Sequence, residues 1–210
     1  MFKKIKSLIK RLISTLNVKV FLRITRVRHL FPLYQFFSKL KKDDYVLVKK
    51  DLNFPRVKIG SDFDIYTKNI EQLNVFINSY YKMRKNYHLT RNKLEDGHEH
   101  IDIFYRNRFK YKLDIYDINL DSLIHNKTFI EDVINTSSIT QFRYFFKFKV
   151  NLPCDEMDLI IRIFEFYSHP HKIHHELIIN SASESTLNNA KNKIQNYSSV
   201  KLDELLAYLK

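Results

Sequence analysis

The sequence lacks tryptophan and has only two glycines, four prolines and one cysteine among its 210 residues. With a single cysteine, Cys154, the chain can form neither an internal disulfide nor a cysteine-based zinc site. No apolar run is long enough to span a bilayer. Charged residues interrupt every apolar stretch near the N-terminus, so no secretory signal peptide is predicted. These absences predict an intracellular, cytoplasmic protein.

Acidic residues are also missing from positions 1–42. Apolar residues recur at helical spacing from Phe2 to Leu16, with lysine and arginine mostly off that stripe, which predicts a basic amphipathic helix. Such a helix can lie on an anionic membrane surface or on nucleic acid, and the formal net charge of +13 favours a polyanionic partner. It can also pack on its own domain with a solvated lysine face. A lysine-rich surface also arises from AT-rich codon usage without any partner.

Three parts are predicted along the chain: a basic helical extension at 1–42, a core at 43–150 and a helical C-terminal region at 151–210. The hydrophobic fraction of 44% is enough for a normal core. Strand-like and helix-like patterns are both present, so the predicted fold class is α+β. The expected strands are 45–49, 57–67, 98–105, 109–117 and 142–150, and the expected helices include 33–40, 69–84, 155–167 and 172–180.

The most informative stretch is Gly60-Ser61-Asp62-Phe63-Asp64. On a strand, Asp62 and Asp64 lie on one face, while Phe63 lies on the other. Two carboxylates on one face repel each other, and a divalent cation between them relieves that repulsion. A Gly-Ser turn can bring backbone N–H groups close to a phosphate. The stretch therefore predicts a site for a metal ion and a phosphate together.

Two further aspartates lie between apolar residues on the predicted hairpin that follows: Asp102, in Ile101-Asp102-Ile103, and Asp114, in Leu113-Asp114-Ile115. With the Gly-Ser-Asp-x-Asp strand, they form a pattern that resembles the DNA polymerase β superfamily of nucleotidyltransferases. The pattern is similar to that of members found in polysaccharide-biosynthesis contexts. The resemblance covers residues 45–117.

The resemblance implies a nucleotidyltransferase-like mixed sheet with helices on one side. It implies Mg²⁺-dependent transfer of a nucleoside monophosphate from a nucleoside triphosphate to a hydroxyl or phosphate acceptor. Two Mg²⁺ ions would be held by Asp62, Asp64 and a third carboxylate, either Asp114, which matches best, or Asp102. Gly60 and Ser61 would contact the nucleotide. In most members the Gly-Ser turn lies earlier, ahead of an intervening helix, whereas here it directly precedes the aspartate pair.

Histidines offer further candidates. His98 and His100 alternate along a strand ahead of Asp102, so all three can face a metal ion, although an exposed strand end is the favoured interpretation. A second group, His169–His175, contains four histidines, two of them at helical i, i+4 spacing. Its alternatives are a zinc site or a contact to nucleotide or acceptor.

Three functions remain open from the sequence. The leading hypothesis is the nucleotidyltransferase. The second is a non-catalytic module of the same fold that binds a membrane surface or nucleic acid through the basic N-terminus. The third is a metal-dependent nuclease or phosphatase that uses the same carboxylates.

Overall fold

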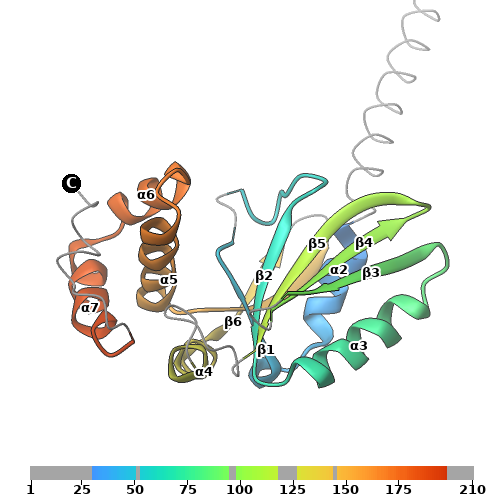
Figure 1. The fold of residues 1–210 in the computed structure, drawn as a ribbon, viewed down its shortest axis with the longest axis horizontal. Helices are drawn as coiled ribbons and strands as arrows, with labels where there is room; N and C mark the ends of the chain where they lie inside the picture. Colours follow the sequence, from blue (N-terminus) through green and yellow to red (C-terminus); the bar gives the residue numbers. More distant parts are fainter. Residues whose placement is uncertain (1–29, 51–52, 95–97, 118–126, 144–145, 198–210) are drawn as a thin grey trace, which may run out of the picture.

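A five-stranded mixed sheet forms the centre of the computed structural model, which describes residues 30–50, 53–94, 98–117, 127–143 and 146–197 (Figure 1). The strand order is β1-β2-β5-β4-β3. Strands β2 and β5 run parallel, and the other neighbouring pairs run antiparallel. The strands are β1 (Tyr45–Val48), β2 (Asp62–Thr67), β3 (Tyr87–Lys93), β4 (Glu99–Tyr105) and β5 (Arg108–Asp117). The predicted helix at 2–16 lies outside the described residues.

Helices and a separate hairpin surround this sheet, and together they confirm the α+β class. The hairpin of β6 (Ser138–Arg143) and β7 (Lys147–Leu152) was predicted only as one strand at 142–150. Strand β2 begins five residues later than expected, because a turn-rich segment precedes it. The helices are α2 (Leu30–Lys39), the short 3₁₀ helix η1 (Lys42–Asp44), α3 (Ile70–Lys82), α4 (Lys127–Thr136), α5 (Asp155–Ser168), α6 (Ile173–Asn180) and α7 (Glu184–Ile194).

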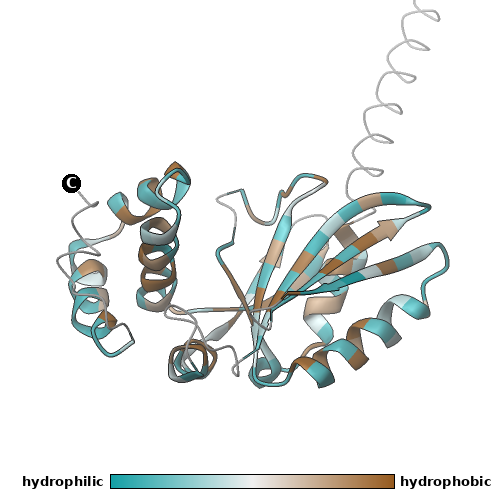
Figure 2. Ribbon diagram, viewed as in Figure 1, coloured by the Kyte–Doolittle hydropathy of each residue, from teal (hydrophilic) through white to brown (hydrophobic). Residues whose placement is uncertain are grey.

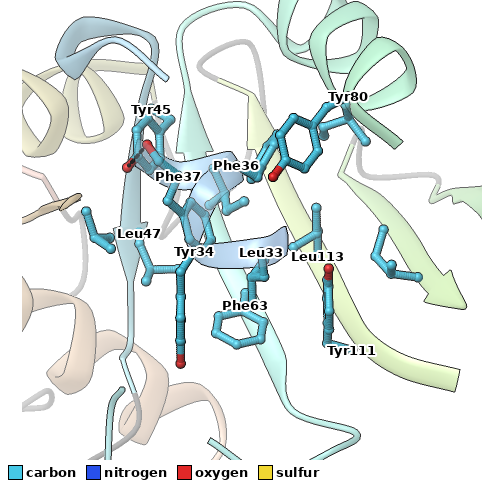
Figure 3. Close-up of a cluster of buried hydrophobic side chains, with 14 of the residues drawn as sticks. Leu33, Tyr34, Phe36, Phe37, Tyr45, Leu47, Phe63, Tyr80, Tyr111 and Leu113 are labelled. Carbon is cyan, nitrogen blue, oxygen red and sulfur yellow. Dashed lines mark hydrogen bonds between the residues drawn. The ribbon is translucent and has the colours of Figure 1, made fainter. Parts of the chain in front are cut away.

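The main core lies between one face of the sheet and helices α2 and α3 (Figure 3). Leu33, Phe36 and Phe37 of α2 are buried there against Phe63 of β2. Burying one such side chain stabilises the fold by about 1.5–3 kcal/mol. Helix α2 therefore belongs to the core, although it falls within the predicted N-terminal extension. Helix α2 begins three residues before the expected 33–40, and Pro32 is accommodated because it lies in the first turn, where no N–H is needed.

The opposite face of the sheet is divided into an apolar and a polar part. At the β1–β2 end, Val46, Val48 and Tyr66 pack in a second buried cluster with α4 and α5. Helices thus cover both faces at this end, whereas the expectation was helices on one side only. Hydrophilic and hydrophobic residues alternate along the strands (Figure 2). Further across this face, Asp64 and Asp114 replace the apolar residues, and these two aspartates mark the candidate site.

Candidate functional site

The parallel pairing of β2 with β5 brings two of the predicted aspartates together. Asp64 lies directly opposite Asp114, and Asp62 lies directly opposite Lys112. Because side chains alternate along a strand, Asp62, Asp64 and Asp114 all point away from the main core, which receives Phe63. The direct neighbour of Asp64 is thus Asp114, whereas Asp102 lies on β4, the strand beyond β5.

Two lysines form ion pairs with the three carboxylates. The ammonium of Lys112 lies 3.1 Å from Asp114 Oδ2 and 3.6 Å from Asp62 Oδ2. The ammonium of Lys49 lies 2.7 Å from Asp64 Oδ1. The aspartate side chains differ in exposure, at 53% for Asp62, 16% for Asp64 and 9% for Asp114. The site is therefore open to solvent at Asp62 and becomes progressively more buried toward Asp114.

Burial dominates the electrostatics of Asp114. It raises the pKa of the Asp114 carboxyl above its usual value, and the neighbouring Asp64 carboxylate raises it further, while Lys112 acts in the opposite direction. Burial works against the charged form of Lys112, but the Asp114 carboxylate outweighs it, so the pKa of Lys112 is raised. A carboxyl whose pKa is raised by burial and by a neighbouring charge is typical of functional sites.

Two histidines, one on β4 and one just before it, extend the site on the other side of Asp114. His100 lies directly opposite Asp114 across the β4–β5 pairing, and His98 directly precedes β4, with its ring beside that of His100. The Nε2 atoms of His98 and His100 are 2.7 Å apart, and His100 Nε2 is 3.4 Å from Asp114 Oδ1. Within the described residues these three side chains form a group whose ligand atoms all lie within 4.8 Å of one another. This group can hold a metal ion.

The histidine pair was expected to lie at an exposed strand end, or to bind a metal ion together with Asp102. Both histidines are instead half-buried, and the carboxylate grouped with them is Asp114. Asp102 is also half-buried and lies opposite Lys112. The i, i+2 spacing correctly brought the two imidazoles together, but only the register of β4 with β5 identifies their partner.

Tyr116 connects the histidines to the aspartate pair. Its ring stacks on that of His98, with centroids 4.6 Å apart and planes 12° apart. Its hydroxyl donates to Asp64 Oδ1 over 3.3 Å. Burial, followed by the charges of Asp64 and Asp114, raises the pKa of Tyr116, so the phenol stays neutral and remains a donor. The histidine and aspartate groups are therefore parts of one polar surface.

The Gly-Ser turn lies at the entrance to β2 but uses its backbone donors within the protein. The Gly60 N–H donates to Lys110 O over 2.8 Å, and the Ser61 N–H donates to Lys58 O over 3.3 Å. Gly60 has a φ of 91°, a conformation that a side chain would strain. Contrary to the expectation, these two N–H groups are therefore already bonded within the protein and do not point to a phosphate site. Only the Ser61 hydroxyl remains for such a contact.

Helix α5 contributes Glu165 to the site, a contact that the sequence pattern did not predict. Lys49, next to the end of β1, bridges Asp64 and Glu165, with its ammonium 2.9 Å from Glu165 Oε1. Nearby, Arg162 Nη2 donates to Lys50 O over 2.9 Å, which fixes α5 to the same segment. Lys112 could have been found from its position two residues before Asp114 on the same face. Lys49 and Glu165 come together only through folding.

The four histidines of the His169–His175 segment do not converge on one point. His175 is buried against Arg162, and His169 lies 3.8 Å from Glu165. Among the described residues, the His98, His100 and Asp114 group is the one with metal-binding geometry. The predicted zinc site at the C-terminal histidines is therefore not formed in this part of the chain.

The chain matches no protein-family model, and no curated protein matches it either. None of the helices in the described residues combines the length and the apolar character needed to cross a bilayer. The function must therefore be argued from the site itself.

Proposed function

We propose that the protein is a Mg²⁺-dependent nucleotidyltransferase that moves a nucleoside monophosphate from a nucleoside triphosphate to a hydroxyl or phosphate acceptor. The observation that supports this proposal most strongly is the pairing of Asp64 with Asp114 on adjacent parallel strands, with Asp62 on the same face. Phosphoryl transfer needs mainly positioning and charge neutralisation, and converging carboxylates suit both.

The donor set fits Mg²⁺, which prefers carboxylate oxygens. Asp62, Asp64 and Asp114 are the residues that would hold two ions, and the ions would supply positive charge to the triphosphate. Asp114 Oδ1 is buried and, within the described residues, accepts no hydrogen bond. A buried oxygen of this kind costs free energy unless a cation or donor reaches it.

The protein's own groups have separate roles in this proposal. Asp114, buried beside Asp64, would accept the proton of the acceptor hydroxyl as that oxygen attacks the α-phosphorus and pyrophosphate leaves. Lys112 lies beside both Asp62 and Asp114, where its charge can also meet a phosphate. Ser61, at the start of β2, would contact the nucleotide through its hydroxyl, since its N–H is already used.

The test is a calorimetric titration of ATP, CTP, GTP and UTP in the presence of Mg²⁺. We expect one nucleotide to bind the natural protein and to lose its Mg²⁺-dependent binding in Asp64→Asn. The matched control is Asp155→Asn, which changes an exposed aspartate at the start of α5. Equal binding by Asp64→Asn and the natural protein would exclude Asp64 from the site.

A non-catalytic module of the same fold is the alternative, favoured by the net charge of +13. It predicts no Mg²⁺-dependent binding of any nucleotide. It also predicts salt-sensitive binding to anionic vesicles or nucleic acid that is lost on deleting residues 1–16. Release of inorganic phosphate or free nucleotide without a modified acceptor would instead indicate the hydrolase.

A further inference from the structure

The histidine side of the site differs in chemistry from the aspartate side. It offers two imidazole nitrogens and one carboxylate oxygen, from His98, His100 and Asp114. Imidazole is a good ligand for Zn²⁺, Co²⁺, Fe²⁺ and Ni²⁺, whereas Mg²⁺ prefers an octahedron of oxygens and keeps several waters. Three protein ligands of this kind leave a further coordination position open, as in zinc sites that bind water or substrate.

The ligand atoms lie close enough together for a small tetrahedral ion, all within 4.8 Å of one another. With metal–nitrogen bonds of about 2.0–2.1 Å, tetrahedral ligands lie about 3.3 Å apart. His100 Nε2 and Asp114 Oδ1 are already 3.4 Å apart. The Nε2 atoms of His98 and His100 are hydrogen-bonded at 2.7 Å and need to separate by about 0.6 Å, with the metal replacing that hydrogen bond. Because both rings are only half-buried, side-chain rotations can supply this movement.

Surrounding residues orient these ligands. Lys112 binds Oδ2 of Asp114, so that Oδ1 is left facing the histidines without a hydrogen bond among the described groups. Tyr116 stacks on the ring of His98 and restricts its rotation. Outer contacts of this kind commonly fix the orientation of metal ligands. The arrangement is therefore more than a chance meeting of exposed side chains.

We infer that His98, His100 and Asp114 form a transition-metal site, of the Zn²⁺ class, that competes with Mg²⁺ for Asp114. Asp114 lies on β5, between β2 and β4. It is opposite Asp64 on the β2 side and opposite His100 on the β4 side. An ion held by the histidines engages Oδ1 and draws this carboxylate away from Asp64. Binding of the transition metal stands by itself, whereas its inhibitory effect on the Mg²⁺ site rests on the proposed function.

The binding is tested by titrating the tag-free, chelator-treated full chain with Co²⁺ and recording visible absorption, followed by displacement with Zn²⁺. We expect one equivalent of Co²⁺ with the intense bands of a low-coordinate site, displaced by Zn²⁺ but not by a large excess of Mg²⁺. The double variant His98→Gln/His100→Gln should weaken binding by more than about 100-fold, since losing even an outer-shell partner costs about 10- to 100-fold.

The matched control is His169→Gln/His171→Gln, which removes two exposed histidines whose ring centroids are 5.9 Å apart. This variant should bind Co²⁺ as the natural protein does. Loss of binding in the control, unchanged binding in the His98/His100 variant, or displacement by Mg²⁺ would overturn the assignment. A single variant, His98→Gln, gives a second measurement should the double variant unfold, and it should weaken binding at least about tenfold.

The competition is tested separately, by repeating the nucleotide titration with Mg²⁺ in the presence of one equivalent of Zn²⁺. We expect Zn²⁺ to weaken nucleotide binding at least about tenfold in the natural protein and to have no effect in His98→Gln/His100→Gln. Equal nucleotide binding with and without Zn²⁺ would overturn the competition. If no nucleotide binds under any condition, the proposed function and the competition both fail, while the Co²⁺ titration still decides whether the metal site exists.

Discussion

The bridge from Lys49 to Glu165 provides a quantitative test of how the site is attached to the C-terminal helices. Both side chains are more than nine-tenths buried, at 9% and 8% exposure, and their charged atoms are 2.9 Å apart. Burial opposes the charged form of Lys49, but the carboxylates of Asp64 and Glu165 outweigh it and raise its pKa. Lys49 is therefore charged at neutral pH, and removing either partner leaves a buried charge with a weaker set of partners, Asp64 for Lys49 and Lys172 for Glu165.

The perturbation is a double-mutant cycle with Lys49→Met and Glu165→Gln, measured by urea unfolding with far-UV circular dichroism. Each single variant should lower the free energy of unfolding by about 2 kcal/mol, less than for a buried charge left wholly unpaired, because Asp64 and Lys172 remain as partners. The double variant should lose about 2 kcal/mol less than the sum of the two, since it removes both charges together. Methionine keeps most of the volume of Lys49, so the cycle reports mainly on charge.

A surface pair of the same residue types supplies the matched control. Lys193 and Glu156 lie 3.5 Å apart with side chains that are 42% and 30% exposed. The cycle of Lys193→Met and Glu156→Gln should give a coupling below about 1 kcal/mol, as is usual for exposed pairs. A coupling between Lys49 and Glu165 that is no larger than this control would refute the argument that burial makes the bridge strong.

Two further predictions concern other buried polar groups. Asn151 on β7 donates from Nδ2 to Tyr45 O at 2.7 Å and Lys42 O at 2.8 Å. In urea unfolding, Asn151→Ala should therefore lower the free energy of unfolding by about 2 kcal/mol. The control Asn92→Ala, at an exposed position, should change it by less than about 0.5 kcal/mol. Burial, His174 and Arg162 lower the pKa of His175 from 6.5 to about 3, so its contribution to stability is complete above pH 6.5 and is lost as the pH falls toward about 3. Between these pH values the free energy of unfolding should carry an extra slope of at most about 1.4 kcal/mol per pH unit, and this slope should disappear in His175→Gln. Parallel profiles of unfolding free energy for the two proteins between about pH 6 and 4 would contradict this.

Local signals were sufficient to predict the strands that carry the candidate site. The β4–β5 hairpin was expected from a short polar link between two apolar–polar runs, and its turn has positive φ angles at Arg106 and Asn107. Strand β6 was missed because five of its six residues are polar or exposed, which gives no alternation to read. It is a strand only because it pairs with β7 along its whole length.

At the site, too, the sequence could not predict features that depend on how distant strands pair. The apolar-Asp-apolar pattern was enough to select Asp114, since a carboxylate between Leu113 and Ile115 must face away from the core. The pattern could not show that His100, rather than Asp102, is the residue opposite it, because register depends on pairing along the entire strand. Nor could it show Lys49 beside Glu165, which is 116 positions away in the sequence.

The position of β5 within the sheet explains why one carboxylate belongs to two groups. A strand at an edge has one neighbour, whereas β5 has β2 on one side and β4 on the other, so Asp114 meets Asp64 and His100 at once. Its two oxygens are already differentiated, because Lys112 holds Oδ2 while Oδ1 faces His100. Asp114→Asn should therefore impair both Mg²⁺-dependent nucleotide binding and Co²⁺ binding, whereas Asp64→Asn should impair the first alone. That asymmetry follows from the strand order, and two independent sites would not produce it.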